Sequence, residues 1–206
     1  MLYMLDSFLS KYKMTSYWGP LGWATLHSAS LLYSDEPTKS EKDLMERFLQ
    51  AFKATITCAN CKHHFTDFYT QYKTTTPSYL DSRNNFALFV MIAHNSVNRR
   101  LDKPVLQTAD ICLETLKKME PYSSFITLRQ AYMNYLQRIW SKDISSDGFM
   151  SRKSIQELVK INNEYLNVRT LNWSPIEGSV IQTQFSNPPA KLRRGIGGFK
   201  NGKLVF

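Results

Sequence analysis

The chain has 206 residues, of which 26 are basic and 17 acidic, so its net charge is +9. Hydrophobic residues at 43% and aromatic residues at 13% exclude a wholly disordered protein, and three cysteines are too few for a secreted scaffold held by disulfides. Charged residues interrupt every apolar stretch before it reaches the roughly 18–20 residues of a membrane-spanning helix, so we expect a soluble intracellular chain.

The first half of the chain is predicted to be helical. Residues 1–14 are apolar but have neither a basic leader nor a cleavage site of small residues, so we expect no signal peptide. Apolar side chains then recur at helical spacing in five segments separated by polar or proline-containing turns. The predicted helices are 17–33, 40–57 with Ser40 as its N-cap, one that starts near Cys58 and breaks at 73–78, 83–101 and 108–119. Helices with connections of this length form a bundle whose seam can hold a cofactor.

The second half of the chain differs in composition. One amphipathic helix is predicted over 123–140, and a short helix over 151–163 follows a polar break. The expected buried stripe of the first is Phe125, Leu128, Ala131, Tyr135 and Ile139. From residue 174 onward we expect an extended chain with a strand at 179–185 and another at the very end. Residues 121–206 hold 12 basic and 5 acidic residues, so most of the net charge lies in this half.

The segment Cys58-Ala59-Asn60-Cys61-Lys62-His63-His64 is the most informative part of the first half. Two cysteines with this spacing at a helix start lie near unpaired amide groups and the positive end of the helix dipole, which stabilises a thiolate. This arrangement suits a reducible disulfide. A zinc site and two buried thiols are the alternatives, although adjacent histidines on a helix point about 100° apart and no second CxxC completes a zinc site.

Two further segments carry aromatic, imidazole and basic side chains. Trp23 and His27 share a helix face and can flank a flat heteroaromatic ring, or else both belong to the core. His94 and Asn98 also share a face. Three basic residues follow them: Arg99, Arg100 and Lys103. These cations suit phosphate oxygens, or alternatively they only complement a helix C-terminus.

Taken together, the three segments resemble the FAD-linked sulfhydryl oxidases of the Erv/ALR type. The shared pattern is WGxxxWxxLH from residue 18, CxxCxxHF from residue 58 and HNxVNxxLxKP from residue 94. The conjunction and order of these motifs within residues 15–120 are specific, and the resemblance is to the short forms carried by large DNA viruses. Asp102 departs from the pattern, because glycine is frequent there.

The resemblance implies a four-helix bundle plus a short fifth helix that binds FAD over residues 1–120. It does not reach residues 121–206, which we expect to form a helical, partly irregular extension of unassigned function. It implies that a substrate thiolate attacks Cys58 of a Cys58–Cys61 disulfide. Cys61 then passes electrons to FAD, and O2 reoxidises the flavin to give H2O2. The FAD-binding residues that it implies are Gly19, Trp23, His27, His64, His94, Asn95, Asn98, Arg100 and Lys103, with no metal.

The resemblance also implies a thioredoxin-like dithiol or other thiol protein as substrate, a homodimer, and a cytoplasmic location in a host cell or virion. Cys112 is the one cysteine outside the pair, so no second, shuttle disulfide can form within this chain. We expect Cys112 to be a buried thiol, or alternatively a bridge between subunits. The alternative function is a basic nucleic-acid- or virion-binding module with a structural CxxC. Its basic residues are Lys191, Arg193, Arg194, Lys200 and Lys203.

Overall fold

The computed structural model describes residues 15–177, 199–200 and 203–204 of the chain. This part contains the α-helices α2 (Thr15–Leu32), α3 (Lys39–Thr55), α4 (Ala59–Thr75), α5 (Arg83–Arg100), α6 (Ala109–Met119), α7 (Phe125–Trp140) and α8 (Ser146–Ile161). A π-helical turn, η1 (Asn162–Leu166), continues α8. Two short antiparallel strands, β1 (Phe199–Lys200) and β2 (Lys203–Leu204), pair near the end of the chain.

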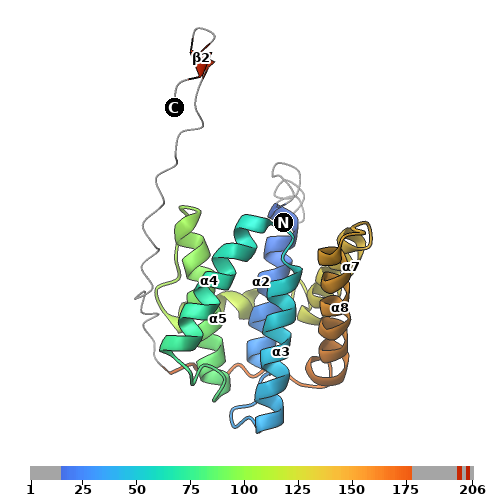
Figure 1. Ribbon diagram of the computed structural model, residues 1–206. Helices are drawn as coiled ribbons and strands as arrows, with labels where there is room; N and C mark the ends of the chain where they lie inside the picture. Colours follow the sequence, from blue (N-terminus) through green and yellow to red (C-terminus); the bar gives the residue numbers. More distant parts are fainter. Residues whose placement is uncertain (1–14, 178–198, 201–202, 205–206) are drawn as a thin grey trace.

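The helices form one bundle in which α2 and α3 lie centrally. Figure 1 shows α4 and α5 on one side of this pair and α7 and α8 on the other. The main contacts agree with this view, because α2 packs on α5 and α7, and α3 packs on α8 and α4. The predicted architecture, four helices (α2–α5) with a short fifth (α6) and a helical extension, is therefore confirmed.

Most helix starts are set by a residue whose side chain accepts a hydrogen bond from a backbone amide three positions on. Cys58, Ser82, Thr108 and Ser145 do this for α4, α5, α6 and α8. Such caps satisfy one of the amide groups that a helix leaves unpaired. The prediction that Ser40 caps the second helix is wrong. Thr38 caps α3 and Glu41 bonds back to the Thr38 amide, so the true signal was this capping box.

Three other predicted boundaries or faces also differ from the structure. Helix α4 continues through Lys73 to Thr75 before the break, and the hydroxyls of its last threonines bond to carbonyls four residues earlier. Helix α8 begins at Ser146 rather than residue 151, because Ser145 bonds to the amide of Gly148. The stripe predicted for 123–140 is partly wrong: Leu128, Ala131 and Ile139 are only half-buried. The buried side of α7 consists of Phe125, Arg129, Tyr132, Met133, Tyr135 and Leu136.

Two clusters of buried side chains hold the bundle together. The larger one joins α2, α3, α4, α5, α7 and α8, with Phe48, Phe86 and Tyr132 fully enclosed. The smaller one packs α6 against α2 and α5 and includes Cys112. Non-polar burial on this scale is the main stabilising contribution to a helical bundle.

Within the described residues, none of the helices combines the length and apolar character needed to cross a membrane. The predictions for residues 1–14, for the strand at 179–185 and for Lys191, Arg193 and Arg194 lie outside the described residues.

Candidate active site

Cys58 and Cys61 lie at the start of α4 and form a disulfide, with their Cα atoms 5.2 Å apart. Cys58 is the N-cap residue, and its Sγ accepts a hydrogen bond from the backbone N–H of Cys61 at 3.3 Å. The helix start predicted for this pair is therefore confirmed. At this position the amide groups and the helix dipole favour a negatively charged sulfur, so reduction of the disulfide yields a stabilised thiolate. Both cysteines are half-buried, and Cys61 packs against the larger core cluster.

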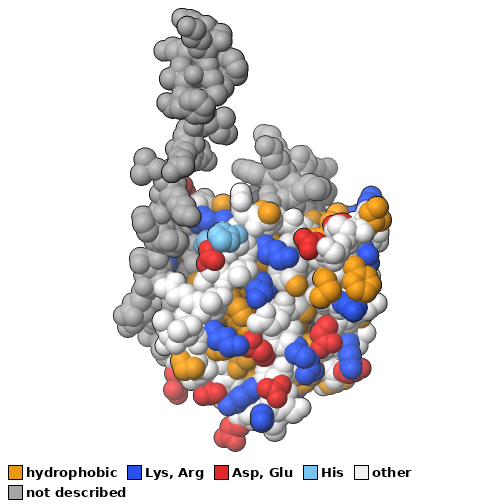
Figure 2. Space-filling model, in the orientation of Figure 1, with side chains coloured by type: hydrophobic (Ala, Val, Ile, Leu, Met, Phe, Trp, Pro, Cys, Tyr) orange, Lys and Arg blue, Asp and Glu red, His pale blue; other side chains and the backbone are white. Residues whose placement is uncertain are grey.

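The two histidines that follow point in different directions. His63 is exposed and its Nε2 lies 3.3 Å from the carboxylate of Asp67, one turn further along α4. Figure 2 shows a histidine at the surface next to an acidic side chain on this part of the molecule. His64 is half-buried, and burial together with the positive charge of Arg100 lowers its pKa. Only His64 therefore faces the interior next to the disulfide.

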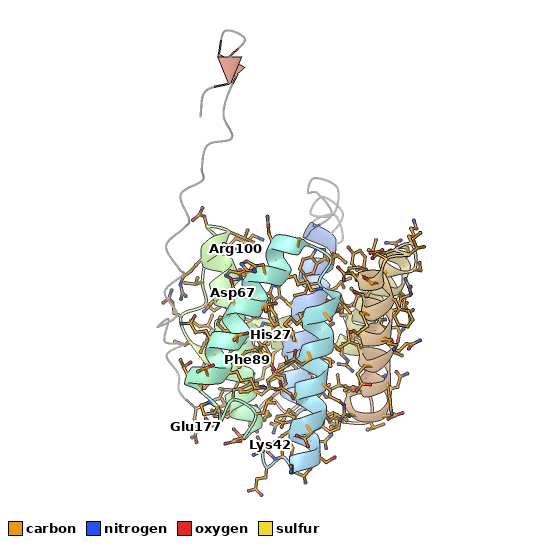
Figure 3. The ribbon with its side chains drawn as sticks, in the orientation of Figure 1. His27, Lys42, Asp67, Phe89, Arg100 and Glu177 are labelled. Atoms are coloured by element: carbon orange, nitrogen blue, oxygen red, sulfur yellow. A yellow bond between two sulfur atoms is a disulfide. The ribbon has the colours of Figure 1, made fainter. Side chains whose placement is uncertain are left out.

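The end of α5 meets the start of α4. The Arg100 guanidinium donates from Nη1 to the carbonyl of Asn60, inside the CxxC segment, at 3.4 Å. Figure 3 shows Arg100 and Asp67 toward the same end of the bundle, with His27 nearer its middle. Burial also lowers the pKa of Arg100, which nevertheless stays protonated at neutral pH. A fixed positive charge thus lies beside the segment that carries the Cys58–Cys61 disulfide.

Trp23, His27 and His94 form an aromatic cluster between α2 and α5. The Trp23 and His94 rings are stacked, with centroids 4.2 Å apart and planes 9° apart. His27 Nε2 lies 3.0 Å from His94 Nδ1, so one of these imidazoles donates a hydrogen bond to the other. Sequence spacing predicts that Trp23 and His27 share a helix face, whereas in the structure the ring stacked on Trp23 is that of His94 from α5.

Burial controls the protonation of both imidazoles in this cluster. The pKa of His27 falls well below its ordinary value because the ring is enclosed and because His94 is adjacent. The pKa of His94 falls to about 4, mainly through burial and further through the charge of Lys103. Both rings are therefore neutral at pH 7 and can accept or donate a hydrogen bond without carrying charge.

The loop after α5 is shaped by asparagines. The Asn95 amide donates to the carbonyl of Leu106 at 2.8 Å and accepts from its N–H at 3.0 Å, so its side chain fixes this loop directly. The carbonyl of Asn98 accepts from the N–H of Lys103 at 2.8 Å. Asp102 lies between them with a φ of 52°, in the left-handed region. This conformation explains why glycine is frequent at that position of the family pattern.

The remaining predicted residues are more exposed. Lys103 is exposed after the end of α5, and Asn98 is half-buried on its last turn. Gly19, in the first turns of α2, has open space where a Cβ would be. Cys112, by contrast, is buried in α6 as a free thiol, as expected, and burial raises its pKa to about 12. Within the described ranges no group of three or more potential metal-binding side chains comes together.

Unpaired buried nitrogens show what this region can bind. His27 Nδ1, His64 Nδ1 and Arg100 Nε are enclosed and have no hydrogen-bond partner among the described residues. Buried polar atoms are normally paired, so these three atoms indicate a polar ligand. Helix α5 connects the aromatic cluster of Trp23, His27 and His94 with the disulfide end of the bundle. His94 and Arg100 are six residues apart on this helix, a rise of about 9 Å. Flat rings, neutral imidazoles and a cation beside a disulfide fit FAD, which offers stacking surfaces and phosphate oxygens.

The sequence does not predict that Lys62, Tyr135 and Trp140 contact the chain just before the disulfide. The Lys62 ammonium donates to the carbonyl of Ala54 at 3.0 Å, and the Trp140 indole N–H donates to the carbonyl of Thr55 at 3.0 Å. The hydroxyls of Tyr135 and Thr57 are 3.4 Å apart. Only the position of Lys62, one turn into α4, gave a local signal. The α7 residues are about 80 positions away in the sequence.

Comparison with known proteins agrees with this geometry. The Erv1 / Alr family model matches residues 21–139, which is more than half of the chain and extends into α7. Over 94 residues the chain is 31% identical to an FAD-linked sulfhydryl oxidase of African swine fever virus, covering 46% of this chain and 76% of that protein. Over 86 residues it is 33% identical to the mitochondrial FAD-linked sulfhydryl oxidase ERV1 of Saccharomyces cerevisiae, covering 42% and 43%. Protein 096R of Invertebrate iridescent virus 3 is 34% identical over 89 residues, which are 43% of this chain and 59% of that protein.

Proposed function

This chain belongs to the Erv1/Alr family of FAD-linked sulfhydryl oxidases, and we propose that it forms disulfides in protein substrates by exchange at Cys58–Cys61. The observation that carries the proposal is the disulfide at the N-cap of α4, beside the unpaired nitrogens of His64 and Arg100. A redox pair and a polar, ring-lined site next to it are the two parts that a flavin-linked thiol oxidase needs.

The exchange itself uses the two cysteines. A substrate thiolate attacks the Cys58 sulfur, the bond to Cys61 breaks, and Cys61 leaves as a thiolate. A second substrate thiol, after losing its proton, attacks the mixed disulfide and releases oxidised substrate with Cys58 as a thiolate. The packing of Cys61 against the larger core cluster supports this division. FAD, when bound, accepts the two electrons of the reduced pair and passes them to O2, which with two protons becomes H2O2.

The proposed FAD-binding residues have different tasks. Trp23, His27 and His94 offer rings and neutral imidazole nitrogens, and His64 with Arg100 offers polar atoms near the disulfide. Arg100 and Lys103 suit the phosphates. Gly19 leaves open space on α2. Asn98 borders the loop after α5, where its carbonyl accepts a hydrogen bond from the N–H of Lys103. Asn95 supports the site through the loop that it fixes at Leu106.

The proposal also covers the substrate, the roles of the two parts of the chain and the location of the protein. A thioredoxin-like dithiol is the proposed substrate, since Cys112 is buried and this chain has no further cysteine to form a shuttle pair with it. We propose that residues 1–120 carry the chemistry and 121–206 support it, in a homodimer. The cytoplasm of a host cell, or a virion, is the proposed location, by resemblance to oxidases of large DNA viruses such as African swine fever virus.

The test is an absorption spectrum followed by an oxygen electrode. The purified protein should be yellow, bind FAD and consume O2 when dithiothreitol is added, with production of H2O2. A folded protein that stays colourless and does not bind added FAD would overturn the proposal.

A second candidate concerns the end of the chain. Residues 178–206 contain five basic and no acidic residues, which favours an anionic partner such as nucleic acid. Replacing Lys191, Arg193 and Arg194 by glutamine should then abolish salt-sensitive DNA binding by the full chain. Binding that is unchanged in this variant, or absent in the parent protein, rules this function out.

A further inference from the structure

The connection between α3 and the redox disulfide is short and held from several directions. Helix α3 ends at Thr55, and only Ile56 and Thr57 separate it from Cys58. The last carbonyls of a helix have no partner within the helix, so the chain that leaves it can take several paths. Here the Ala54 carbonyl is bound by Lys62 of α4 and the Thr55 carbonyl by Trp140 of α7. Ile56 itself is buried in the larger core cluster, with 4% of its surface exposed.

Helix α7 contacts the same connection at a second point. The Tyr135 hydroxyl lies 3.4 Å from the hydroxyl of Thr57, the residue directly before Cys58. Tyr132 lies about one turn before Tyr135 and is fully buried. Its ring packs against Phe52 in the last turn of α3, with ring centroids 5.6 Å apart. One face of α7 therefore follows the chain from the end of α3 to the redox pair.

The end of α7 is itself fixed by α8. The Arg152 guanidinium of α8 donates to the carbonyl of Trp140 at 2.9 Å, and it also binds the carbonyl of Asp143 in the turn between the helices. Helix α8 in turn packs along α3, and the Arg47–Glu157 ion pair, at 2.9 Å, joins these two helices. Helices α7 and α8 are thus joined to each other and to α3, and together they support the connection.

We propose that Trp140 and Tyr135 are positioning residues for the redox pair: they hold residues 55–57 so that Cys58 stays at the α4 cap within bonding reach of Cys61. This inference rests on the proposed function and adds to it a role for the α7–α8 extension. Positioning raises the effective concentration of one sulfur at the other, which favours the disulfide in exchange with a small thiol.

The indole N–H of Trp140 allows a narrow test. Trp140→Phe keeps a large aromatic ring but removes the donor to Thr55. Trp173→Phe is the matched control, because Trp173 packs on Phe125 in the smaller core cluster, away from this connection. The equilibrium between the Cys58–Cys61 disulfide and glutathione is measured in both variants of the full chain by alkylation and mass spectrometry, together with the melting temperature.

In Trp140→Phe the equilibrium constant for forming the Cys58–Cys61 disulfide should fall by at least about threefold, while Trp173→Phe stays within about twofold of the parent protein. Both variants should lose a similar amount of thermal stability. Equal equilibrium constants in parent and Trp140→Phe, or an equal fall in the control, would overturn the positioning role.

Thr57→Val provides a second route that does not depend on the indole. It removes only the hydroxyl that meets Tyr135 and should shift the same equilibrium in the same direction by about twofold. An unchanged constant in a folded Thr57→Val protein counts against Tyr135. Because the glutathione equilibrium needs no flavin and no turnover, a failure of this inference is distinguishable from a failure of the proposed oxidase activity.

Discussion

The starts of α4 and α6 both carry cysteines, which lie at different positions relative to the cap. In α4 the cysteine is itself the cap: Cys58 lies outside the first turn and bonds through Sγ to the Cys61 amide. In α6 the cap is Thr108, which bonds to the Ile111 amide, and Cys112 lies four residues further on, facing the core. The pKa of Cys112 rises to about 12 because the thiol is buried.

We infer from this difference that a helix start activates a thiol at the cap or within the first turn, but not four residues after the cap. The unpaired amides and the dipole act within the first turn, and four residues later the side chain meets the core rather than the amides. Burial disfavours a thiolate, so Cys112 is inert although its helix start resembles that of α4. Four experiments test this comparison.

The largest effect on turnover is expected from replacing the disulfide-forming cysteines rather than the buried Cys112. Cys58→Ser or Cys61→Ser should lower O2 consumption with dithiothreitol by at least about a thousandfold, because exchange needs both sulfurs. Cys112→Ala should leave turnover within about twofold and cost about 1–2 kcal/mol of stability through the cavity that it creates. A comparable loss of turnover in Cys112→Ala would remove the distinction between the two regions.

The second experiment tests whether burial also controls the protonation of an imidazole, at His94. The pKa of His94 is about 4 in the folded protein and near 6.5 in the unfolded chain, so the unfolded chain binds more protons between these values. Stability is therefore complete above pH 6.5 and should fall by about 3 kcal/mol as the pH drops to 4, with a further loss from His27. Urea unfolding at pH 7 and pH 4.5, at equal cofactor occupancy, measures this loss.

His94→Asn should remove most of that dependence on pH, whereas His63→Asn should not, because His63 is exposed beside Asp67. Equal slopes in all three proteins would contradict the buried, neutral state assigned to His94.

The third experiment moves a thiol to the cap position of α6. In Thr108→Cys combined with Cys112→Ala, the new thiol replaces the hydroxyl that caps the helix, so its pKa should be lowered toward neutrality. Its alkylation by iodoacetamide at pH 7 should be at least about tenfold faster than that of Cys112 in the parent protein. Peptide mass spectrometry gives both rates, and equal rates would show that the cap position does not activate the thiol.

The smallest effect is expected at a helix C-terminus. Asp102 follows α5 with a φ of 52°, so Asp102→Gly should raise the free energy of unfolding by about 1 kcal/mol. Asp110→Gly, in the first turn of α6, should lower it by about the same amount, because glycine is unfavourable inside a helix. Urea unfolding of both variants measures the two changes, and a change of the same sign in both would mean that the local backbone conformation is not the cause.

Local signals account for the parts of the fold that the sequence predicted well. Helices α2 to α6 follow from apolar spacing and from capping residues, and these act over about four residues. Wrong boundaries arise where two local signals compete. At the start of α3, Thr38 and Glu41 form a capping box, so Thr38 rather than Ser40 caps the helix. The stripe of α7 could not be read from spacing, because Arg129 replaces an apolar residue on its buried side.

The buried Arg129 illustrates why tertiary contacts decide such cases. Its guanidinium donates to the side-chain carbonyls of Asn162 and Asn167, both at 2.8 Å and more than 30 residues away. These bonds make burial of a cation tolerable, although burial lowers its pKa to about 10. No pattern within α7 contains this information.

The sequence by itself determined the Cys58–Cys61 pair, its place at a helix start and the motifs that mark the family, because each depends on residues within a turn or two of one another. Only the tertiary structure decided that His94 rather than His27 stacks on Trp23 and that Trp140 reaches the carbonyl of Thr55. These contacts join residues 71 and 85 positions apart. Their geometry depends on how whole helices pack, which spacing along one helix does not specify.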